Sequence, residues 1–420
     1  MTIASFHKRA KGENALLYTQ IKLHFKNQDK LQIKEMKIAE KLAEKLRTNV
    51  YKARVNAEKE ANRLKEEATQ FLKKQEIDAK THENFTLMAD EFEKDHCKIV
   101  NKSFYLVETA ERIIVKTKRL LFDAYEHMTY KDGNGKDQCF VEKWCHNNPN
   151  IRLYNDMEIY PNRAECPPNM YNLWRPFAME ILTEPYEKNK DALALFLNHI
   201  KILCDNDEIV ADYFVKWIAQ MLQYPWIKSI CLILISKEGA GKGCLLKLLE
   251  KMIGNTKYFE TSKPKRDVWG DFNRQMADSF LVNLNELSKA DTLEATGVIK
   301  TLITDSALTI NSKGVNQYDI TSYRRFIITT NNDDPIAVKD NDRRLIIISS
   351  SNENLGDAKY FNMMFDYLKD VNVIRTCFDY FKSIRDMDTT HQQNLQASNK
   401  SAPNNVVSRL CASKLRRGQR

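Results

Sequence analysis

A glycine-containing loop is the first segment whose residue types and spacing could do chemistry. An apolar run at residues 229–235 leads into it, and the helical pattern CLLKLLEKMI follows it. Backbone N–H groups in such a loop can surround phosphate oxygens, and the start of the following helix favours negative charge. Lys242 would place a positive charge beside the outer phosphates of a nucleotide. The predicted nucleotide-binding residues are Ser236, Lys237, Glu238, Gly239, Ala240, Gly241, Lys242, Gly243 and Cys244.

Two positions depart from the usual phosphate-binding loop, G-x-x-x-x-G-K-[ST]. Ser236 stands where the first glycine is usual, and Gly243 stands where a hydroxyl usually binds magnesium. The loop by itself therefore leaves open a glycine-rich turn that binds no nucleotide.

A second apolar segment, residues 280–285, ends at two residues suited to metal binding and hydrolysis. The run FLVNLN predicts a buried strand, with Asn285 and Glu286 at its end. A carboxylate at this place can polarise an attacking water. Asn285 replaces the commoner aspartate, and an amide oxygen holds Mg²⁺ more weakly than a carboxylate does. We predict Asn285 and Glu286 as the metal side of the site and Glu286 as a catalytic residue.

Two further strands bring polar residues to the same predicted crevice. The run RFIITT at residues 325–330 is followed by Asn331, and Arg343 and Arg344 precede the strand pattern at residues 345–349. Polar side chains at the ends of adjacent strands converge on one crevice. Asn331 would orient water or sense the γ-phosphate, and Arg343 or Arg344 would stabilise the transition state. Each residue alone is compatible with a strand cap or a surface arginine, but the set in this order favours ATP hydrolysis.

Together these segments resemble the viral superfamily 3 helicases. Lys242, Glu286 and Asn331 follow one another at intervals of about 45 residues, a compact spacing similar to that of the group. Within the group, the chain looks most like poxvirus-type primase-helicases and their phage and giant-virus relatives. The resemblance covers residues 96–395 and is looser before Lys190. Further matching segments are YFVKWIAQMLQYPWIK at residues 213–228, Asn285-Glu286, Thr330-Asn331 and Arg343-Arg344.

The resemblance implies an ATP- and Mg²⁺-dependent replicative DNA helicase of a viral or mobile-element genome. Such a protein forms a ring, usually a hexamer, in which ATP lies between subunits and the neighbour supplies the arginine. The expected partners are single-stranded or duplex DNA, other copies of this chain, and a separate primase or polymerase, but no membrane. No convincing primase active site is seen in residues 1–95.

A β-hairpin is predicted between residues 299 and 323, with Lys313 at its turn. The resemblance places this hairpin in the central channel, where Lys313 would hold the phosphate backbone of one DNA strand without reading its sequence. A lysine that is merely solvated at a turn is the alternative.

Two other classes of function compete with the helicase. The first is another P-loop enzyme: a packaging motor is disfavoured by the Asn331 motif and the short motor, and a nucleotide kinase is disfavoured because nothing after Lys242 resembles a lid. A nucleotide-binding scaffold without turnover is disfavoured by Glu286 and the paired arginines.

The predicted fold class is α/β, with an AAA+-like P-loop ATPase core around a central parallel sheet. Residues 1–95 are rich in Lys, Glu and Ala and predict a solvated helical region rather than a coiled coil. Two amphipathic helices should pack beneath the motor before residue 224. The predicted divisions are 1–95, the charged helical region; 96–187, an accessory α/β domain; 188–350, the ATPase domain; 351–395, a helical lobe; and 396–420, a disordered basic tail.

Composition limits the class of protein. Of 420 residues, 43% are hydrophobic and 29% are charged, and no apolar run approaches the roughly 18 residues that span a bilayer. Nine unpatterned cysteines favour reduced thiols, and the net charge of +9 weakly favours a polyanionic partner. We therefore expect an intracellular protein of the host cytoplasm or nucleus. The spacing of Cys139, Cys145, His146 and Cys166 fits no usual zinc site and predicts buried thiols instead.

Overall fold

The computed structural model describes residues 19–20, 22–23, 25–26, 28–37, 52–132, 135–286, 289–332 and 344–385. These residues belong to two compact units. The first comprises Met1–Glu91 and Glu126–Asn147, and the second comprises Phe92–Tyr125 and Asn148–Arg420. No helix in the described ranges is both long enough and apolar enough to cross a membrane. The predicted tail at residues 396–420 lies outside the described residues.

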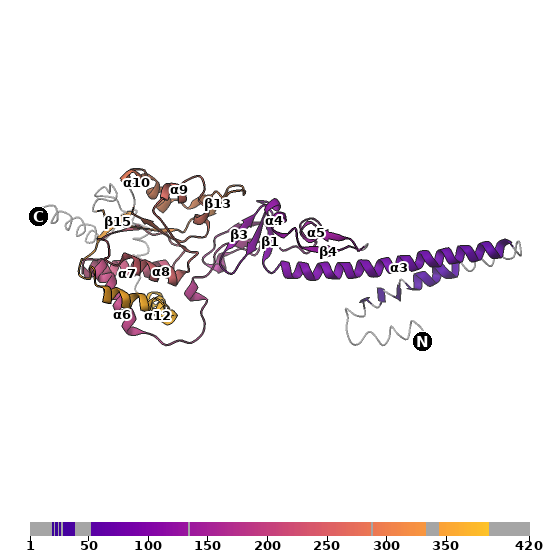
Figure 1. The fold of residues 1–420 in the computed structure, drawn as a ribbon, viewed down its shortest axis with the longest axis horizontal. Helices are drawn as coiled ribbons and strands as arrows, with labels where there is room; N and C mark the ends of the chain where they lie inside the picture. Colours follow the sequence, from indigo (N-terminus) through magenta and orange to yellow (C-terminus); the bar gives the residue numbers. More distant parts are fainter. Residues whose placement is uncertain are drawn as a thin grey trace. The chain divides into compact units, whose positions relative to one another are not determined.

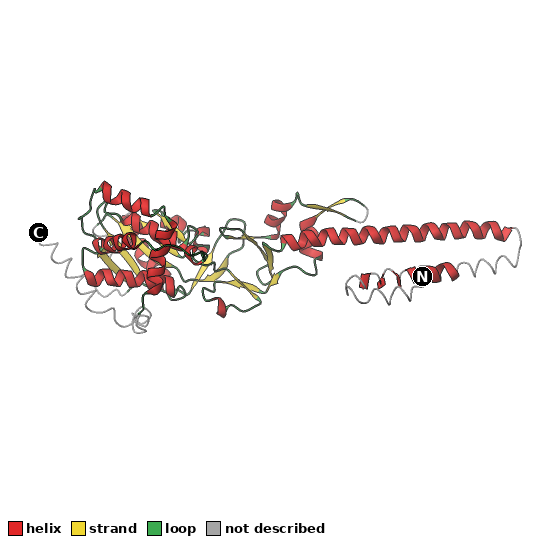
Figure 2. Ribbon diagram, turned by 90° about the horizontal axis from the view of Figure 1, so that it is seen from below, coloured by secondary structure: helices red, strands yellow, loops and turns green. Residues whose placement is uncertain are grey.

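A long helix, α3 (Lys52–Phe92), dominates the first unit (Figure 2). Its Lys-, Glu- and Ala-rich sequence favours helix, and most of its described side chains are exposed, including Phe71 at 58%. The described part of α3 is therefore a helix whose side chains are mostly exposed to solvent.

The end of α3 packs against a short hairpin and helix of the same unit. Phe85 contacts Tyr130 and Phe140, with ring centroids 5.5 and 5.4 Å apart. Residues 126–147 thus group with α3 rather than with the predicted accessory domain, because aromatic contacts distant in sequence join them. The elements are β4 (Thr129–Lys131), β5 (Asp137–Cys139) and α5 (Phe140–Asn147).

The second unit begins with a four-stranded sheet in the order β3-β2-β1-β6, in which only the β1–β6 pair is parallel. A helix and a second, parallel strand pair accompany this sheet. The elements are β1 (His96–Ile99), β2 (Phe104–Glu108), β3 (Ile113–Lys116), α4 (Lys118–Tyr125), β6 (Leu153–Tyr154), β7 (Asp156–Glu158) and β8 (Met170–Asn172).

A five-stranded, all-parallel sheet forms the centre of the second unit, in the order β10-β11-β14-β9-β15. Figure 1 labels its edge strand β15. Its strands are short apolar runs because both faces of a parallel sheet are covered. The predicted central parallel sheet is confirmed. The strands are β9 (Cys231–Ile235), β10 (Tyr258–Thr261), β11 (Leu281–Asn285), β14 (Arg325–Thr330) and β15 (Leu345–Ser349).

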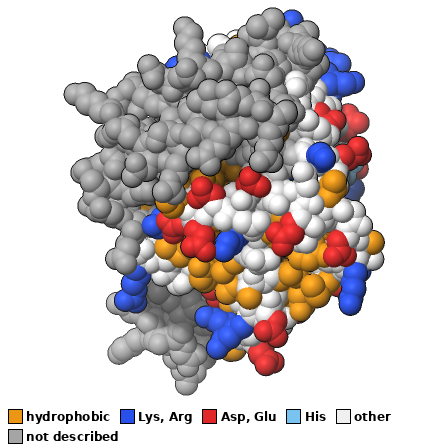
Figure 3. Space-filling model, turned by 90° about the vertical axis from the view of Figure 1, so that its left-hand side faces the viewer, with side chains coloured by type: hydrophobic (Ala, Val, Ile, Leu, Met, Phe, Trp, Pro, Cys, Tyr) orange, Lys and Arg blue, Asp and Glu red, His pale blue; other side chains and the backbone are white. Residues whose placement is uncertain are grey.

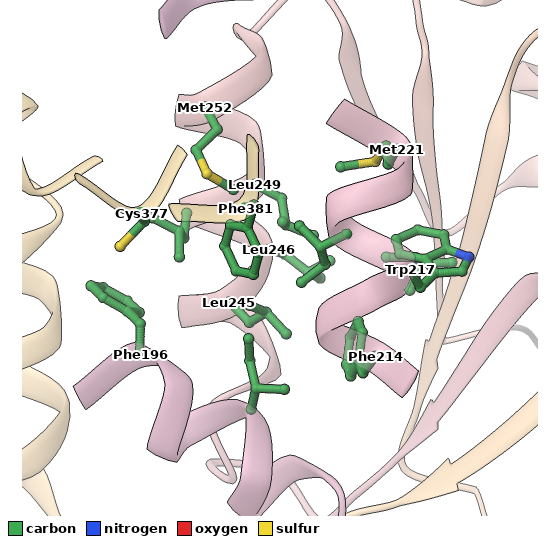
Figure 4. Close-up of a cluster of buried hydrophobic side chains, with 14 of the residues drawn as sticks. Phe196, Phe214, Trp217, Met221, Leu245, Leu246, Leu249, Met252, Cys377 and Phe381 are labelled. Atoms are coloured by element: carbon green, nitrogen blue, oxygen red, sulfur yellow. The ribbon is translucent and has the colours of Figure 1, made fainter. Parts of the chain in front are cut away.

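Helices cover one face of this sheet and bury a large apolar core (Figure 4). Phe214 and Trp217 from α7 and Leu245 and Leu249 from α8 lie within it, and Phe381 from α12 joins them. The two helices predicted to pack beneath the motor, α6 and α7, are both present. The helices are α6 (Lys190–Leu203), α7 (Glu208–Gln223), α8 (Lys242–Ile253), α11 (Ala358–Tyr367) and α12 (Val371–Ser383).

The other face packs against α10 (Lys289–Thr304) and against a β-hairpin, β12 (Ala307–Ile310) and β13 (Tyr318–Thr321). The antiparallel pairing of β12 and β13 confirms the predicted hairpin. Gly314 in the turn has φ of 78°. Acidic and basic side chains are interspersed on the face drawn in Figure 3. The described residues of this face therefore form no basic patch that would account for the net charge of +9.

Candidate active site

The loop between β9 and α8 depends on glycine at position 241. Gly241 has φ of 93° and directly precedes α8. A Cβ atom there would lie 2.5 Å from both His199 Cε1 and Phe361 Cε1. Backbone conformation and space therefore both require glycine, which lets the chain turn tightly into the first residue of α8, Lys242.

The Lys242 ammonium lies where the carboxyl ends of β9 and β14 meet. Its Nζ donates to Ser236 Oγ at 2.6 Å and to Asn331 Oδ1 at 2.8 Å, and it lies 3.4 Å from the Thr330 carbonyl oxygen. Burial holds the pKa of Lys242 below its ordinary value, although the carboxylates of Glu286 and Glu238 oppose this. Ser236, which stands in place of a glycine, thus supplies a direct partner for the lysine.

Asn331 joins Lys242 to Glu286. While its Oδ1 accepts from the lysine, its Nδ2 donates to Glu286 Oε1 at 2.9 Å. Glu286 has φ of 49°, a left-handed conformation that is uncommon for residues other than glycine, and its backbone N–H donates to the Thr329 carbonyl at 2.8 Å. Three side chains from separate segments of the sequence thus meet at one edge of the parallel sheet.

Asn285 lies beside this group and has partners of its own. Its Oδ1 accepts from Thr329 Oγ1 at 3.0 Å, and its Nδ2 donates to Glu260 Oε1 at 3.0 Å. Glu260, on β10, is a carboxylate at this edge that the sequence analysis missed. In the sequence, Glu260 is marked only by its position in a strand that precedes Asn285. The observed pairing of β10 with β11 is what places Glu260 beside Asn285.

The other predicted site residues lie elsewhere. Arg343 is outside the described residues. The carbonyl of Arg344 accepts from the Cys231 N–H at 2.9 Å, at the amino end of β15. A strand rises about 3.3 Å per residue, so Arg344 lies roughly 16 Å along β15 from Ser349, the residue at the carboxyl end of the strand. Lys313 is exposed in the hairpin turn and is not among the residues that contact Lys242.

A buried histidine beneath the loop was also missed. His199, from α6, is fully buried, and its Nε2 lies 3.0 Å from the Gly241 carbonyl oxygen. Its Nδ1 lies 3.2 Å from the hydroxyl of Tyr360 on α11. Burial lowers the pKa of His199, which favours the neutral ring. The geometry fits Nε2–H donating to Gly241 and Nδ1 accepting from Tyr360, so His199 ties the loop to α11.

Cys139, Cys145 and Cys166 are partly exposed, so the prediction that these thiols are buried is wrong. They lie on short elements and connecting loops, which provide little cover. Across the described ranges, no three His, Cys, Asp or Glu side chains are grouped closely enough to hold a metal ion between them.

Comparisons with known proteins give a matching family and a phage relative. Residues 234–344 match a family described as a family of unknown function (DUF5906). A DNA primase-polymerase of Nitratiruptor phage NrS-1 is 30% identical over 185 residues, which are 43% of this chain and 25% of that protein. The chain thus spans about a quarter of the length of this relative.

Solved structures show the same fold. The apo structure of the NrS-1 C-terminal region (305–718) superposes with a TM-score of 0.53 at 19% identity, covering 72% of this chain and 71% of that one. A second apo form of that region gives a TM-score of 0.52 over 72% of each chain. The chain is therefore related to a phage DNA primase-polymerase and has a mixed α/β fold similar to that of the NrS-1 C-terminal region.

Proposed function

We propose that this chain is an ATP-hydrolysing DNA helicase of the superfamily 3 type that acts in phage or mobile-element DNA replication. The observation that carries the proposal is the chain of contacts from Lys242 through Asn331 to Glu286 at the carboxyl edge of the parallel sheet. The relative's name, DNA primase-polymerase, supports the replication setting.

The residues of the loop suit a triphosphate. Gly239 and Gly241 have positive φ, which lets backbone N–H groups face an anion, and α8 begins directly behind them. Lys242 donates to Asn331 and would instead donate to the β- and γ-phosphates of ATP. Asn331, released from the lysine, would then orient the attacking water while Glu286 accepts its proton.

A Mg²⁺ ion fits the donor atoms at this edge. Asn285 and Glu286 offer oxygen ligands, and Glu260 adds a nearby carboxylate. Mg²⁺ prefers oxygen ligands and would neutralise charge that develops on the phosphates. Gly243 supplies no hydroxyl, so we assign the protein side of the metal site to Asn285 and Glu286.

The position of Arg344 supports a ring. It lies at the amino end of β15, whereas Lys242 lies at the carboxyl end of the adjacent β9. Arg344 therefore cannot reach the phosphates bound by its own chain, and we assign it or Arg343 to the site of a neighbouring subunit in a ring, most simply a hexamer. Lys313, exposed at the hairpin turn, would hold the DNA backbone.

The experiment is ATP hydrolysis with and without single-stranded DNA. Lys242→Ala and Glu286→Gln should each reduce kcat by at least about 100-fold, because a positioned base alone contributes about 10²–10⁴-fold. Lys247→Ala is the matched control, since Lys247 lies on the same helix and pairs with Glu250. ATP binding without turnover in the unaltered protein would overturn the proposed enzymatic activity and favour a nucleotide-binding scaffold. Turnover that DNA does not stimulate would favour a different P-loop ATPase.

A further inference from the structure

A pocket lies at the opposite edge of the parallel sheet from Lys242. It is lined by residues that directly precede three adjacent strands: Lys257 before β10, Phe280 before β11 and Arg324 before β14. Backbone hydrogen bonds join them, from the Phe280 N–H to the Lys257 carbonyl at 2.7 Å and from the Arg325 N–H to the Phe280 carbonyl at 2.8 Å. The strand order, rather than the sequence, brings these residues together.

Two buried cations face this pocket without a carboxylate partner. Lys257 is 7% exposed and Arg324 is 3% exposed, and neither forms an ion pair with any acidic residue that the structure describes. Arg324 donates through Nε to the Met276 carbonyl at 2.7 Å, but its buried Nη1 has no hydrogen-bond partner. Lys257 Nζ lies 3.7 Å from the ring centroid of Trp174. Buried cations of this kind are costly unless an anion compensates them.

Two carboxylates line the pocket, but neither forms an ion pair with Lys257 or Arg324. Asp278 pairs with Arg274 at 2.8 Å, and Glu111 is exposed to solvent. Arg175, which also lines the pocket, pairs with Glu108 at 2.6 Å. Burial lowers the pKa of Lys257 to about 7 and that of Arg324 to about 10, although Asp278 raises both. An anion in the pocket would favour the charged form of Lys257 and offset the burial of the Arg324 charge.

We propose that this pocket binds a phosphate group. The space that water-sized molecules can occupy is about 40 Å³, which is room for about three waters and too little for a nucleoside. The exposed Arg112 stands at its rim. A guanidinium and an ammonium converging on one small space suit a tetrahedral dianion, with any remainder of the ligand outside. The phosphate belongs either to the free anion or to the backbone of a nucleic acid.

The test uses Lys242→Ala as the parent protein, so that phosphate at the proposed ATP site does not contribute. Binding of inorganic phosphate is measured by calorimetry, and Tm is measured without ligand. Lys257→Met in this parent should bind phosphate at least about tenfold more weakly, since a hydrogen bond to a charged group contributes about 1.5–3 kcal/mol. Its Tm without phosphate should rise, because an uncompensated buried charge is removed. A lysine with a merely structural role would instead lower Tm when replaced.

Lys369→Met is the matched control, because Lys369 is exposed, pairs with Asp366 and does not line the pocket. It should leave phosphate affinity unchanged. If Lys257→Met fails to fold, Arg112→Ala replaces it in the test, because the Arg112 side chain is exposed. Arg112→Ala should also weaken phosphate binding. Equal phosphate affinity in the parent and in the folded pocket variants, or no phosphate binding by the parent, overturns the proposal.

Single-stranded DNA distinguishes the two sources of the phosphate. If the backbone is the ligand, an oligonucleotide displaces inorganic phosphate from the parent, and Lys257→Met weakens oligonucleotide binding. If the free anion is the ligand, the oligonucleotide does not compete. Because the parent lacks Lys242, either result is independent of whether the unaltered protein hydrolyses ATP.

Discussion

The imidazole of His199 lies 3.0 Å from the carbonyl oxygen of Gly241, directly beneath the turn that leads into α8. The same ring contacts the Tyr360 hydroxyl, so one buried side chain connects α6, the loop and α11. A side chain in this place does not touch the phosphates, but it fixes the backbone that would surround them.

We expect His199→Ala to raise the KM for ATP about tenfold with a smaller effect on kcat, because losing a buried hydrogen bond costs about 1–3 kcal/mol. His199→Gln, which keeps an N–H donor, should recover much of the lost affinity. Tyr360→Phe should raise KM less than His199→Ala does. If kcat and Tm both fell while KM stayed unchanged, this positioning role would be contradicted.

Stability should fall as the pH drops below 6.5, the ordinary histidine pKa. Burial lowers the pKa of both His199 and His96 in the folded protein, so below 6.5 the unfolded chain binds protons that the folded chain does not. The stability from these groups is therefore present above pH 6.5 and is lost as the pH falls. Tm measured from pH 8 to pH 5 should decline less steeply in His199→Gln; identical slopes would show that His199 contributes nothing.

Gly241 and Gly243 form a natural matched pair. Gly241→Ala should abolish ATP binding and destabilise the protein, because φ is 93° and the new Cβ would meet His199 and Phe361. Gly243 lies inside α8 with open space around its Cβ position, so Gly243→Ala should stabilise the helix by up to about 1 kcal/mol. Tm and ATP affinity measured on both variants test this contrast, which similar losses at the two positions would refute.

Lys313→Glu should reduce the stimulation of ATP hydrolysis by single-stranded DNA while leaving the DNA-independent rate unchanged. The hairpin turn is exposed, and a reversed charge there repels phosphates. The loss should be greater at low salt than at high salt. Lys369→Glu is the control at an exposed site far along the chain, and equal DNA stimulation in the two variants would remove Lys313 from the DNA contact.

Much of the sheet and of the site could be predicted because short-range patterns encode them. Apolar runs mark β9, β11 and β14, and polar residues at the carboxyl ends of parallel strands must share one edge. The meeting of Lys242, Asn331 and Glu286 follows from these two facts and is observed.

The remainder depended on contacts that sequence spacing does not encode. The packing of residues 126–147 with α3 rests on Phe85, which is more than forty residues from Tyr130. His199 looked like part of an apolar helix, and nothing local marked its contact with Gly241. Lys257 and Arg324 are neighbours only because β11 lies between β10 and β14.

β14, the central strand of the sheet, connects the amino ends of the strands with their carboxyl ends. Arg324 directly precedes it and Asn331 directly follows it. Residues 325–329 pair in register with β11, and residues 327–330 pair with β9. A strand held on both sides cannot stretch, so a stiff segment of backbone joins Arg324 to Asn331. If phosphate at Arg324 changes the affinity for ATP near Asn331, then ATP must change the affinity for phosphate by the same factor.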